Sequence, residues 1–225
     1  MQPQADPFIA PPCSEEIKIL YQDDYLLLIN KPAGLLTLSG KHPLNKDSVH
    51  FRLVQDFPTA TMIHRLDFGT SGIMVVALNK AINADIGKQF QDRTVSKSYT
   101  AILHGRLPED AGIMEFPITK GEFPLQKVCY QTGKKALSDY RVLERLENNK
   151  THQLSTRVEF KPLTGRTHQL RVHSAAFGHP ILGCDLYATD EAFFMVNRLM
   201  LHATTLEFEH PITQQRVQGV SPCPF

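Results

Sequence analysis

Hydrophobic and polar residues alternate in short segments along most of this chain, a pattern typical of β-strands. Residues 17–21 and 25–29 flank the pair Asp23-Asp24, which predicts a hairpin. The same reasoning predicts further strands at residues 73–78, 97–104, 113–118, 127–131, 135–146, 152–160, 199–208 and 215–220.

Helical spacing occurs in fewer places. Either Asp47 or Ser48 can cap a helix that ends at Pro58, and residues 82–90 carry apolar side chains on one helical face. Sequential strands joined by short turns favour an antiparallel sheet, and two or three helices laid on it give an α+β fold. No internal repeat or low-complexity segment is present in the sequence.

One stretch, residues 61–78 (TMIHRLDFGTSGIMVVAL), places a charged cluster before two glycines and a run of apolar residues. The glycines let the backbone take positive φ or approach a ligand closely, so a tight turn can hold Asp67 at the mouth of a cleft. A carboxylate in that setting is a candidate catalytic group. The alternative is an Asp that only stabilises the turn.

The charges of the whole chain do not indicate a nucleic-acid-binding protein, but those of one segment do. The 225 residues, 42% of them hydrophobic, can bury a substantial core in one large domain or two small ones. A formal net charge of +1 gives no general argument for nucleic acid. Residues 160–184, however, contain no acid but hold Lys161, Arg166, Arg171 and three histidines. This distribution predicts one basic surface of the kind that binds nucleic acid.

The N-terminal segment, the apolar runs and the cysteines indicate in which cellular compartment the protein works. Residues 1–14 contain four prolines and predict an extended or disordered lead before a single domain over residues 15–225. There is no basic segment followed by an apolar core at the N-terminus and no apolar run of membrane-spanning length. Four scattered cysteines without a CxxC pair fit a reducing compartment. We expect a cytoplasmic monomer that does not contact membranes.

The sequence His64-Arg65-Leu66-Asp67, followed by Thr-Ser-Gly and an apolar strand, resembles the active-site signature of the RluA-type pseudouridine synthases. More motifs resemble this family in the same order, over roughly residues 17–208: Asn30-Lys31-Pro32-Ala33-Gly34-Leu35, Lys97-Ser98-Tyr99, GRTHQLRVH at 165–173 and GHPILG at 178–183. The resemblance implies the pseudouridine synthase fold, a long mostly antiparallel sheet with flanking helices and a central active-site cleft. Many relatives also carry an S4-type RNA-binding domain, which we do not expect here.

The resemblance also implies catalytic roles. Asp67 matches the catalytic residue, and Arg171 matches an arginine that lies against it; a fixed cation keeps a carboxylate ionised in a dry pocket. Tyr99 matches a tyrosine stacked on the target base, whose hydroxyl can assist proton removal from carbon 5. From the residues alone, Arg171 could instead be a surface phosphate contact and Tyr99 an ordinary sheet residue.

Further residues are candidates for holding RNA. Arg65 is implied to enter the space left by the flipped nucleotide, or to hold a neighbouring base or phosphate. Arg166, expected at the start of a helix, suits a phosphate because a helix N-terminus attracts anions. Lys31 and Lys97 are weaker candidates for the same role. His64 is expected to bond backbone and phosphate.

A zinc site built on His64, His168 and His173 is the competing interpretation. His168 and His173 are five residues apart, which does not align two ligands on one helix face as a spacing of four does. This disfavours a metal-dependent hydrolase. A non-catalytic RNA-binding relative is a third possibility, but such a protein would not need both Asp67 and Arg171.

The resemblance therefore implies an RNA pseudouridine synthase that flips its target base and needs no cofactor or metal. Similarities of flanking sequence, including residues 127–134, point to members that modify one uridine in large-subunit ribosomal RNA and one in the anticodon loop of certain transfer RNAs. One departure stands out. Relatives usually have an Asp directly after the glycine matching Gly183, whereas this chain has Cys184 there and Asp185 one position later. This puts the role of that Asp in doubt.

Overall fold

The computed structural model describes residues 8–148 and 153–225. By their contacts the residues form two compact units, which we call the first unit (residues 1–96 and 203–223) and the second unit (97–202 and 224–225). The predicted lead at residues 1–14 lies partly outside the described residues. Its described part is anchored in the first unit, because Asn45 bonds the backbone of both Phe8 and Ala10 at 2.7 and 2.8 Å.

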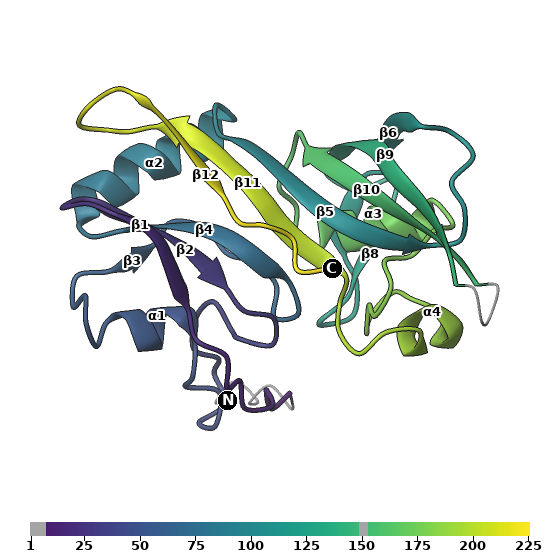
Figure 1. The fold of residues 1–225 in the computed structure, drawn as a ribbon, viewed down its shortest axis with the longest axis horizontal. Helices are drawn as coiled ribbons and strands as arrows, with labels where there is room; N and C mark the ends of the chain where they lie inside the picture. The colour runs from purple at the N-terminus through teal and green to yellow at the C-terminus, as the bar shows by residue number, and fades with distance from the viewer. Residues whose placement is uncertain (1–7, 149–152) are drawn as a thin grey trace. The chain divides into compact units, whose positions relative to one another are not determined.

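The first unit is built on antiparallel strands (Figure 1). The strand β1 (Lys18–Gln22) pairs with β2 (Leu26–Lys31), which confirms the predicted hairpin. The next neighbour of β2 is β4 (Ser71–Ala77), which also pairs with the short β3 (Thr61–Met62). A later hairpin joins β11 (Leu201–Glu209) to β12 (Arg216–Val220).

Two helices belong to the first unit. The helix α1 (Val49–Leu53) is capped by the Ser48 side chain, which accepts from the Phe51 amide at 3.1 Å. The prediction that this helix runs to Pro58 was wrong, because after Leu53 the backbone leaves the helix through turns. The helix α2 (Lys80–Asp92) buries Ile82 and Ile86 as predicted, and it contacts β3 and β4.

The strand β4 lies at the centre of the first unit, and all of its residues are buried. Its glycine, Gly72, has φ 118°, and a Cβ there would lie 2.2 Å from the Ala203 carbonyl oxygen on β11. Only a residue without a side chain allows the two backbones to approach so closely. The strand that follows the Asp67 turn is therefore fixed in the core.

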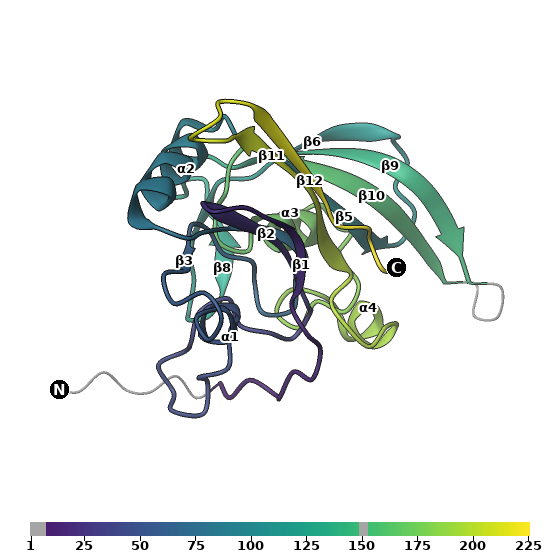
Figure 2. The ribbon, with the colours of Figure 1, turned by 60° about the vertical axis from the view of Figure 1, so that its left-hand side comes forward.

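The second unit carries the longer strands (Figure 2). The strand β5 (Ser96–His104) pairs with β10 (Leu154–Pro162), β10 with β9 (Leu137–Glu147), and β9 with β6 (Ala111–Glu115), all antiparallel. The strands β7 (Ile118–Lys120) and β8 (Gln126–Val128) form a separate two-stranded sheet. The single strand predicted at 113–118 was wrong: the residues between β6 and β7 include Pro117, which has no amide to donate to a ladder.

Two helices belong to the second unit. The helix α3 (Gln169–Ala176) contacts β6 and β8 and begins after His168, which has a left-handed backbone with φ 54°. Arg166 therefore lies before the helix and not at its first turn, which corrects the predicted placement. The short helix α4 (Asp190–Phe194), capped by Thr189, was not predicted from the sequence.

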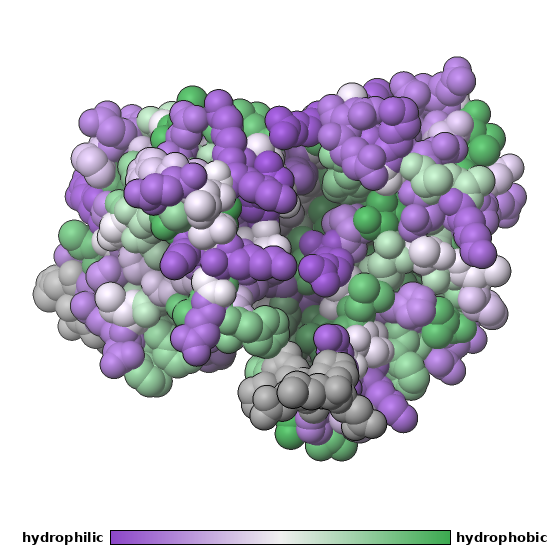
Figure 3. Space-filling model, turned by 180° about the vertical axis from the view of Figure 1, so that it is seen from behind, coloured by the Kyte–Doolittle hydropathy of each residue, from purple (hydrophilic) through white to green (hydrophobic). Residues whose placement is uncertain are grey.

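Hydrogen bonding within the described residues orders the strands β1-β2-β4-β11-β5-β10-β9-β6, with β12 on β11 and β3 on β4, as one ten-stranded sheet. This confirms the α+β class. Hydrophilic and hydrophobic side chains are interspersed on the face drawn in Figure 3. In the part of the chain that the structure describes, no helix has the length and apolar character needed to cross a membrane.

Candidate active site

The Asp67 turn, residues 66–70, is held by main-chain contacts from the first unit. The amide of Thr70 donates to the Asp67 carbonyl at 3.1 Å and closes the turn. The Thr37 hydroxyl donates to the Leu66 carbonyl at 2.8 Å, and Leu66 itself is buried. Since β4 begins at Ser71, the Asp67 carboxyl, which is half-buried, stands directly before the most buried strand of the unit.

Lys31 lies under this turn. Its side chain is fully buried, and the ammonium donates to the carbonyl oxygens of Leu35 at 2.7 Å, Pro32 at 2.9 Å and Phe68 at 3.2 Å. The Phe68 carbonyl also accepts from the amide of Gly34 at 2.9 Å. Lys31 therefore ties the segment after β2 to the residue next to Asp67. Its expected phosphate contact stays a prediction.

His64 and Arg65, the two residues before Leu66, differ in their contacts and exposure. The amide of Val75 on β4 donates to His64 Nε2 at 3.1 Å, and the His64 ring stacks on Phe90 of α2 with ring centroids 4.8 Å apart. An accepting Nε2 leaves the neutral ring's proton on Nδ1. Arg65, in contrast, is exposed. His64 thus anchors the turn to β4 and α2, and Arg65 projects where an RNA could meet it.

Arg171 occupies a buried position on α3, with a side chain 5% exposed. Its terminal nitrogen donates to Asp185 Oδ1 at 2.5 Å and its Nε donates to Cys184 Sγ at 3.3 Å. The guanidinium also lies over the Tyr187 ring, 5.3 Å from its centroid. A buried cation needs a partner, and Asp185 supplies a carboxylate to Arg171 within this unit.

Three other predicted residues lie elsewhere in the second unit. Tyr99 is half-buried on β5, opposite Phe160 on β10. Burial lowers the pKa of Lys97 below its ordinary value, and its ammonium lies next to Gly165, 3.6 Å from where a Cβ would stand. Arg166 Nε donates to the Lys135 carbonyl at 3.2 Å. The structure thus places the Lys97 ammonium beside Gly165, the residue that precedes Arg166.

The predicted set divides between the two units. Asp67, His64, Arg65 and Lys31 belong to the first, whereas Tyr99, Lys97, Arg166 and Arg171 belong to the second. The pairing of Asp67 with Arg171 and the central cleft stay predictions.

The histidines considered for zinc have other partners. His168 Nδ1 lies 2.7 Å from the Tyr187 hydroxyl, and His173 Nε2 lies 3.0 Å from the Phe116 carbonyl. His64 belongs to the other unit. Among residues 8–148 and 153–225 no three His, Cys, Asp or Glu side chains lie together in a way that could hold a metal ion.

Comparison with known proteins decides the family. The family model described as RNA pseudouridylate synthase matches residues 25–176, a span that includes Asp67, Tyr99 and Arg171. The chain belongs to this family.

Similar members are bacterial and human. The dual-specificity RNA pseudouridine synthase RluA of Yersinia pestis is 48% identical over 195 residues, which is 86% of this chain and 92% of that protein. The RluA of Escherichia coli is 43% identical over 217 residues, 96% of this chain and 97% of that one. The solved structure of human RNA pseudouridylate synthase domain containing 1 has a TM-score of 0.81 at 32% identity, covering 96% of this chain and 86% of that one.

Some contacts of this family member were not found from sequence. The Arg171–Asp185 ion pair was missed because Asp185 is out of register with the relatives, although an acid close to the histidine-rich motif could have suggested a partner. The burial of Lys31 was missed because its partners are carbonyl oxygens, which every residue carries. A lysine directly before a proline at the end of an apolar strand was the available signal.

Proposed function

We propose that this protein converts uridine to pseudouridine in RNA with Asp67 as the catalytic carboxylate. The observation that carries the proposal is the Asp67 turn: a half-buried carboxyl on a turn fixed by Lys31, Thr37 and Thr70 ahead of a buried strand. A fixed backbone around a reacting group keeps that group oriented, which is the main advantage of intramolecular chemistry.

The reaction needs bond exchange but no added atoms. The bond from ribose C1′ to N1 of uracil breaks, the base turns, and a bond from C1′ to C5 forms. The hydrogen on C5 leaves and N1 gains one, so the product is an isomer. Asp67 acts as nucleophile toward the ribose or the base, and Tyr99 stacks on the base and assists loss of the C5 proton.

Arg171 serves in this proposal as the counter-ion of Asp67. Asp185 and Cys184 accept hydrogen bonds from a terminal nitrogen and from Nε of Arg171. A guanidinium has five N–H donors in a planar fork, so the same group can also bind a second carboxylate. Arg65 fills the space left by the flipped nucleotide, while Lys97 and Arg166 hold phosphates near the Gly165 turn.

The substrates proposed are large-subunit ribosomal RNA and the anticodon loop of a transfer RNA, since relatives 43% and 48% identical are named dual-specificity RNA pseudouridine synthases. Work on such RNAs takes place in the cytoplasm, and the protein acts as a monomer. Mapping pseudouridines in both RNA classes from a strain that lacks the gene tests this: loss at one position in each class is expected. Loss in only one class would contradict dual specificity.

Incubation with unfractionated bacterial RNA tests the activity itself. We expect pseudouridine to accumulate equally with and without a chelator, because no step uses a metal. Binding of RNA without pseudouridine would favour a non-catalytic RNA-binding protein. RNA cleavage that a chelator stops would favour a metal-dependent hydrolase.

A further inference from the structure

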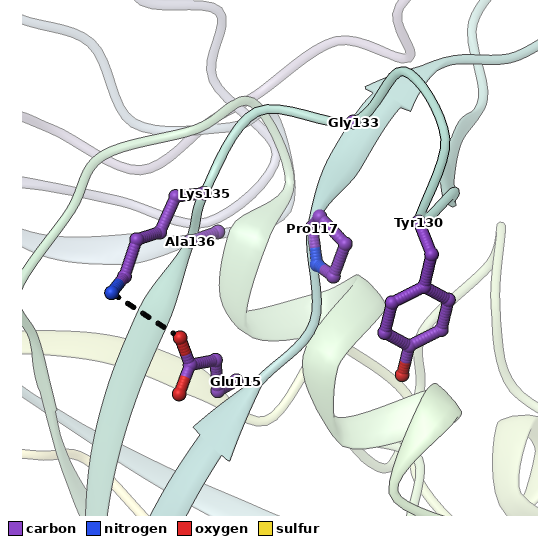
Figure 4. A pocket seen from close by; sticks show the side chains of 6 residues that line it. All are labelled: Glu115, Pro117, Tyr130, Gly133, Lys135 and Ala136. Carbon is purple, nitrogen blue, oxygen red and sulfur yellow. Dashed lines mark ion pairs between the residues drawn. The ribbon is translucent and has the colours of Figure 1, made fainter.

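An open hollow of about 460 Å³ lies in the second unit, and none of the residues proposed for catalysis lines it. Its lining comes from the end of β6, the link between β6 and β7, and the segment that links β8 to β9: Glu115, Pro117, Tyr130, Gly133, Lys135 and Ala136. Figure 4 shows the Lys135–Glu115 ion pair on one side and the Tyr130 ring on the other, with Pro117 between them. The volume falls in the range of about 300–1,000 Å³ that small ligands occupy in proteins.

The loop that presents Tyr130 has a fixed backbone. The amide of Cys129 donates to the Pro117 carbonyl at 2.9 Å, and the amide of Gly133 donates to the Cys129 carbonyl at 2.9 Å. Ile118 and Lys134 exchange two more hydrogen bonds, of 2.8 and 3.0 Å. A Cβ at Gly133 would lie 2.3 Å from the Cys129 carbonyl oxygen, so the loop closes only with glycine there. The loop is therefore ordered before any ligand arrives.

Tyr130 is 72% exposed on this fixed loop. A large aromatic side chain held in water by a rigid backbone is informative, whereas a single exposed aliphatic side chain is not. An aromatic ring next to a concave surface is the arrangement on which an unpaired base stacks. The ring offers one face of such a site, and the proline opposite offers a second apolar wall.

Charge selects the ligand. Lys127, Lys134 and Lys135 are exposed on the strand and loop around the hollow, and Arg166 reaches the same loop through the Lys135 carbonyl. The Lys135–Glu115 pair, 3.4 Å apart, is 71% and 58% exposed, so a phosphate can compete for Lys135. Glu115 can then accept from a ribose hydroxyl or an exocyclic amino group.

We propose that this hollow binds an unpaired nucleotide of the substrate RNA, other than the uridine that is modified, by stacking on Tyr130 and pairing its phosphate with Lys135. The inference rests on the proposed function, because RNA is the ligand. It adds a second RNA contact to the proposed function. The Asp67 turn acts on one nucleotide, and the Tyr130 loop recognises the sequence or shape of the unpaired RNA around that nucleotide.

Binding of two labelled RNAs tests the proposal. One is a stem-loop with an unpaired loop, and the other is a fully paired duplex of the same base composition. Tyr130→Ala should weaken binding of the stem-loop about 5- to 100-fold, because stacking on an aromatic ring is lost. Binding of the duplex should not change. Tyr130→Phe keeps the ring and should bind like the parent protein. Equal stem-loop affinity in parent and Tyr130→Ala would overturn the proposal.

Phe194→Ala is the matched control, since Phe194 is 77% exposed on α4 in the same unit and does not line the hollow. It should leave stem-loop affinity unchanged. An equal loss in Phe194→Ala and Tyr130→Ala would mean that any exposed aromatic contributes, and would overturn the site. Lys135→Ala gives an independent measure, because loss of one phosphate contact should reduce the slope of log affinity against log salt by about 1. An unchanged slope would contradict the phosphate contact.

Cys129, next to Tyr130, provides a reporter that does not depend on turnover. Hydrogen bonds from Thr132 and the nearby backbone lower the pKa of this thiol to about 7, so it should react readily with iodoacetamide near neutral pH. The stem-loop should slow that reaction, and should do so less in Tyr130→Ala. Unchanged alkylation in the presence of saturating stem-loop would overturn the proposal.

Turnover separates this inference from the proposed function. If the parent protein makes pseudouridine and Tyr130→Ala does so with raised KM and unchanged kcat, both stand. If the parent makes pseudouridine and Tyr130→Ala matches it in affinity and KM, only the hollow fails. If the parent makes none while Tyr130→Ala binds the stem-loop weakly, only the proposed function fails.

Discussion

The Asp67 turn and the Tyr130 loop are both supported from beneath by a buried ionisable side chain that bonds backbone carbonyls, but the two supports differ in charge. Lys31 bonds three carbonyls around the Asp67 turn. His173 bonds the Phe116 carbonyl, directly before the Pro117 wall of the hollow. A buried ammonium requires several acceptors, whereas a neutral imidazole requires one. The buried side chain beneath the turn proposed for catalysis therefore makes three hydrogen bonds to carbonyls, and the one beneath the loop proposed to select RNA makes one.

The largest expected effect is on turnover and comes from a substitution in the Asp67 turn. Asp67→Asn should lower turnover by about 10⁴-fold or more, because it removes the nucleophile. RNA binding should stay within about tenfold, since the lost charge would in any case repel phosphates. Single-turnover assays and RNA titrations measure the two quantities. Asp56→Asn, the same change at an exposed site of the first unit, is the control. Appreciable turnover in Asp67→Asn would remove this residue from the mechanism.

Arg171→Lys comes next and asks whether the arginine belongs with catalysis or with RNA binding. The change keeps the charge but loses the planar fork, so turnover should fall about 100-fold while RNA affinity barely moves. A single-turnover assay at saturating RNA decides this. Arg166→Lys is the comparison variant, and it should weaken binding modestly and spare turnover. If Arg171→Lys behaves in the same way as Arg166→Lys, then Arg171 is a phosphate contact.

Lys31→Met sharpens the comparison by removing the support under the Asp67 turn. The unbranched side chain is nearly kept, but the buried carbonyls of Pro32 and Leu35 lose the Lys31 donor and the Phe68 carbonyl keeps only the Gly34 amide. The free energy of unfolding should therefore fall by about 2–4 kcal/mol. Urea titration measures it. Lys135→Met, at a side chain 71% exposed, should change the free energy of unfolding by less than about 0.5 kcal/mol. Equal stability of Lys31→Met and the parent would show that water or another group satisfies those carbonyls.

The support under the Tyr130 loop should respond to pH. Burial lowers the pKa of His173, although its bond to the Phe116 carbonyl acts in the opposite direction. His173 Nδ1 is also buried without a hydrogen-bond partner among the described residues. The pKa in the unfolded chain is about 6.5, above that of the folded protein, so the unfolded chain binds more protons between the two values. Stability should be complete above about pH 6.5 and fall as pH decreases below it.

Urea titrations of the parent and His173→Gln at acid and neutral pH measure this effect, which we expect to be the smallest of the four. Glutamine can still donate to the Phe116 carbonyl but does not titrate. Its stability should therefore fall less on acidification than that of the parent. Parallel losses in the two proteins would assign the pH dependence to other groups.

Much of this could be predicted because local signals and packing agree. Ser48 caps α1, Ile82 and Ile86 face the core, and Gly72 takes the positive φ that its position after Asp67 suggested. Two of the failures occurred where a single residue changes the backbone. Pro117 divides one apolar segment into β6 and β7, and the left-handed His168 delays α3.

The residues of the site show a similar limit to prediction from sequence. Asp67 and Arg171 stand in motifs whose residue types suggest chemistry. Lys31 looks like a cation available to RNA, and only the folded chain reveals the three carbonyls around it. The sequence around Tyr130 does not predict the exposure of its ring, because that exposure depends on how Gly133 closes the loop.

The close approach of Gly72 to Ala203 has a consequence for how such chains diverge. On the proposed function, a descendant that lost the carboxylate at position 67 would lose its activity, yet it could not replace the glycine five residues later without pushing β4 away from β11. The Thr-Ser-Gly part of the motif is thus inherited with the architecture, and the aspartate with the chemistry.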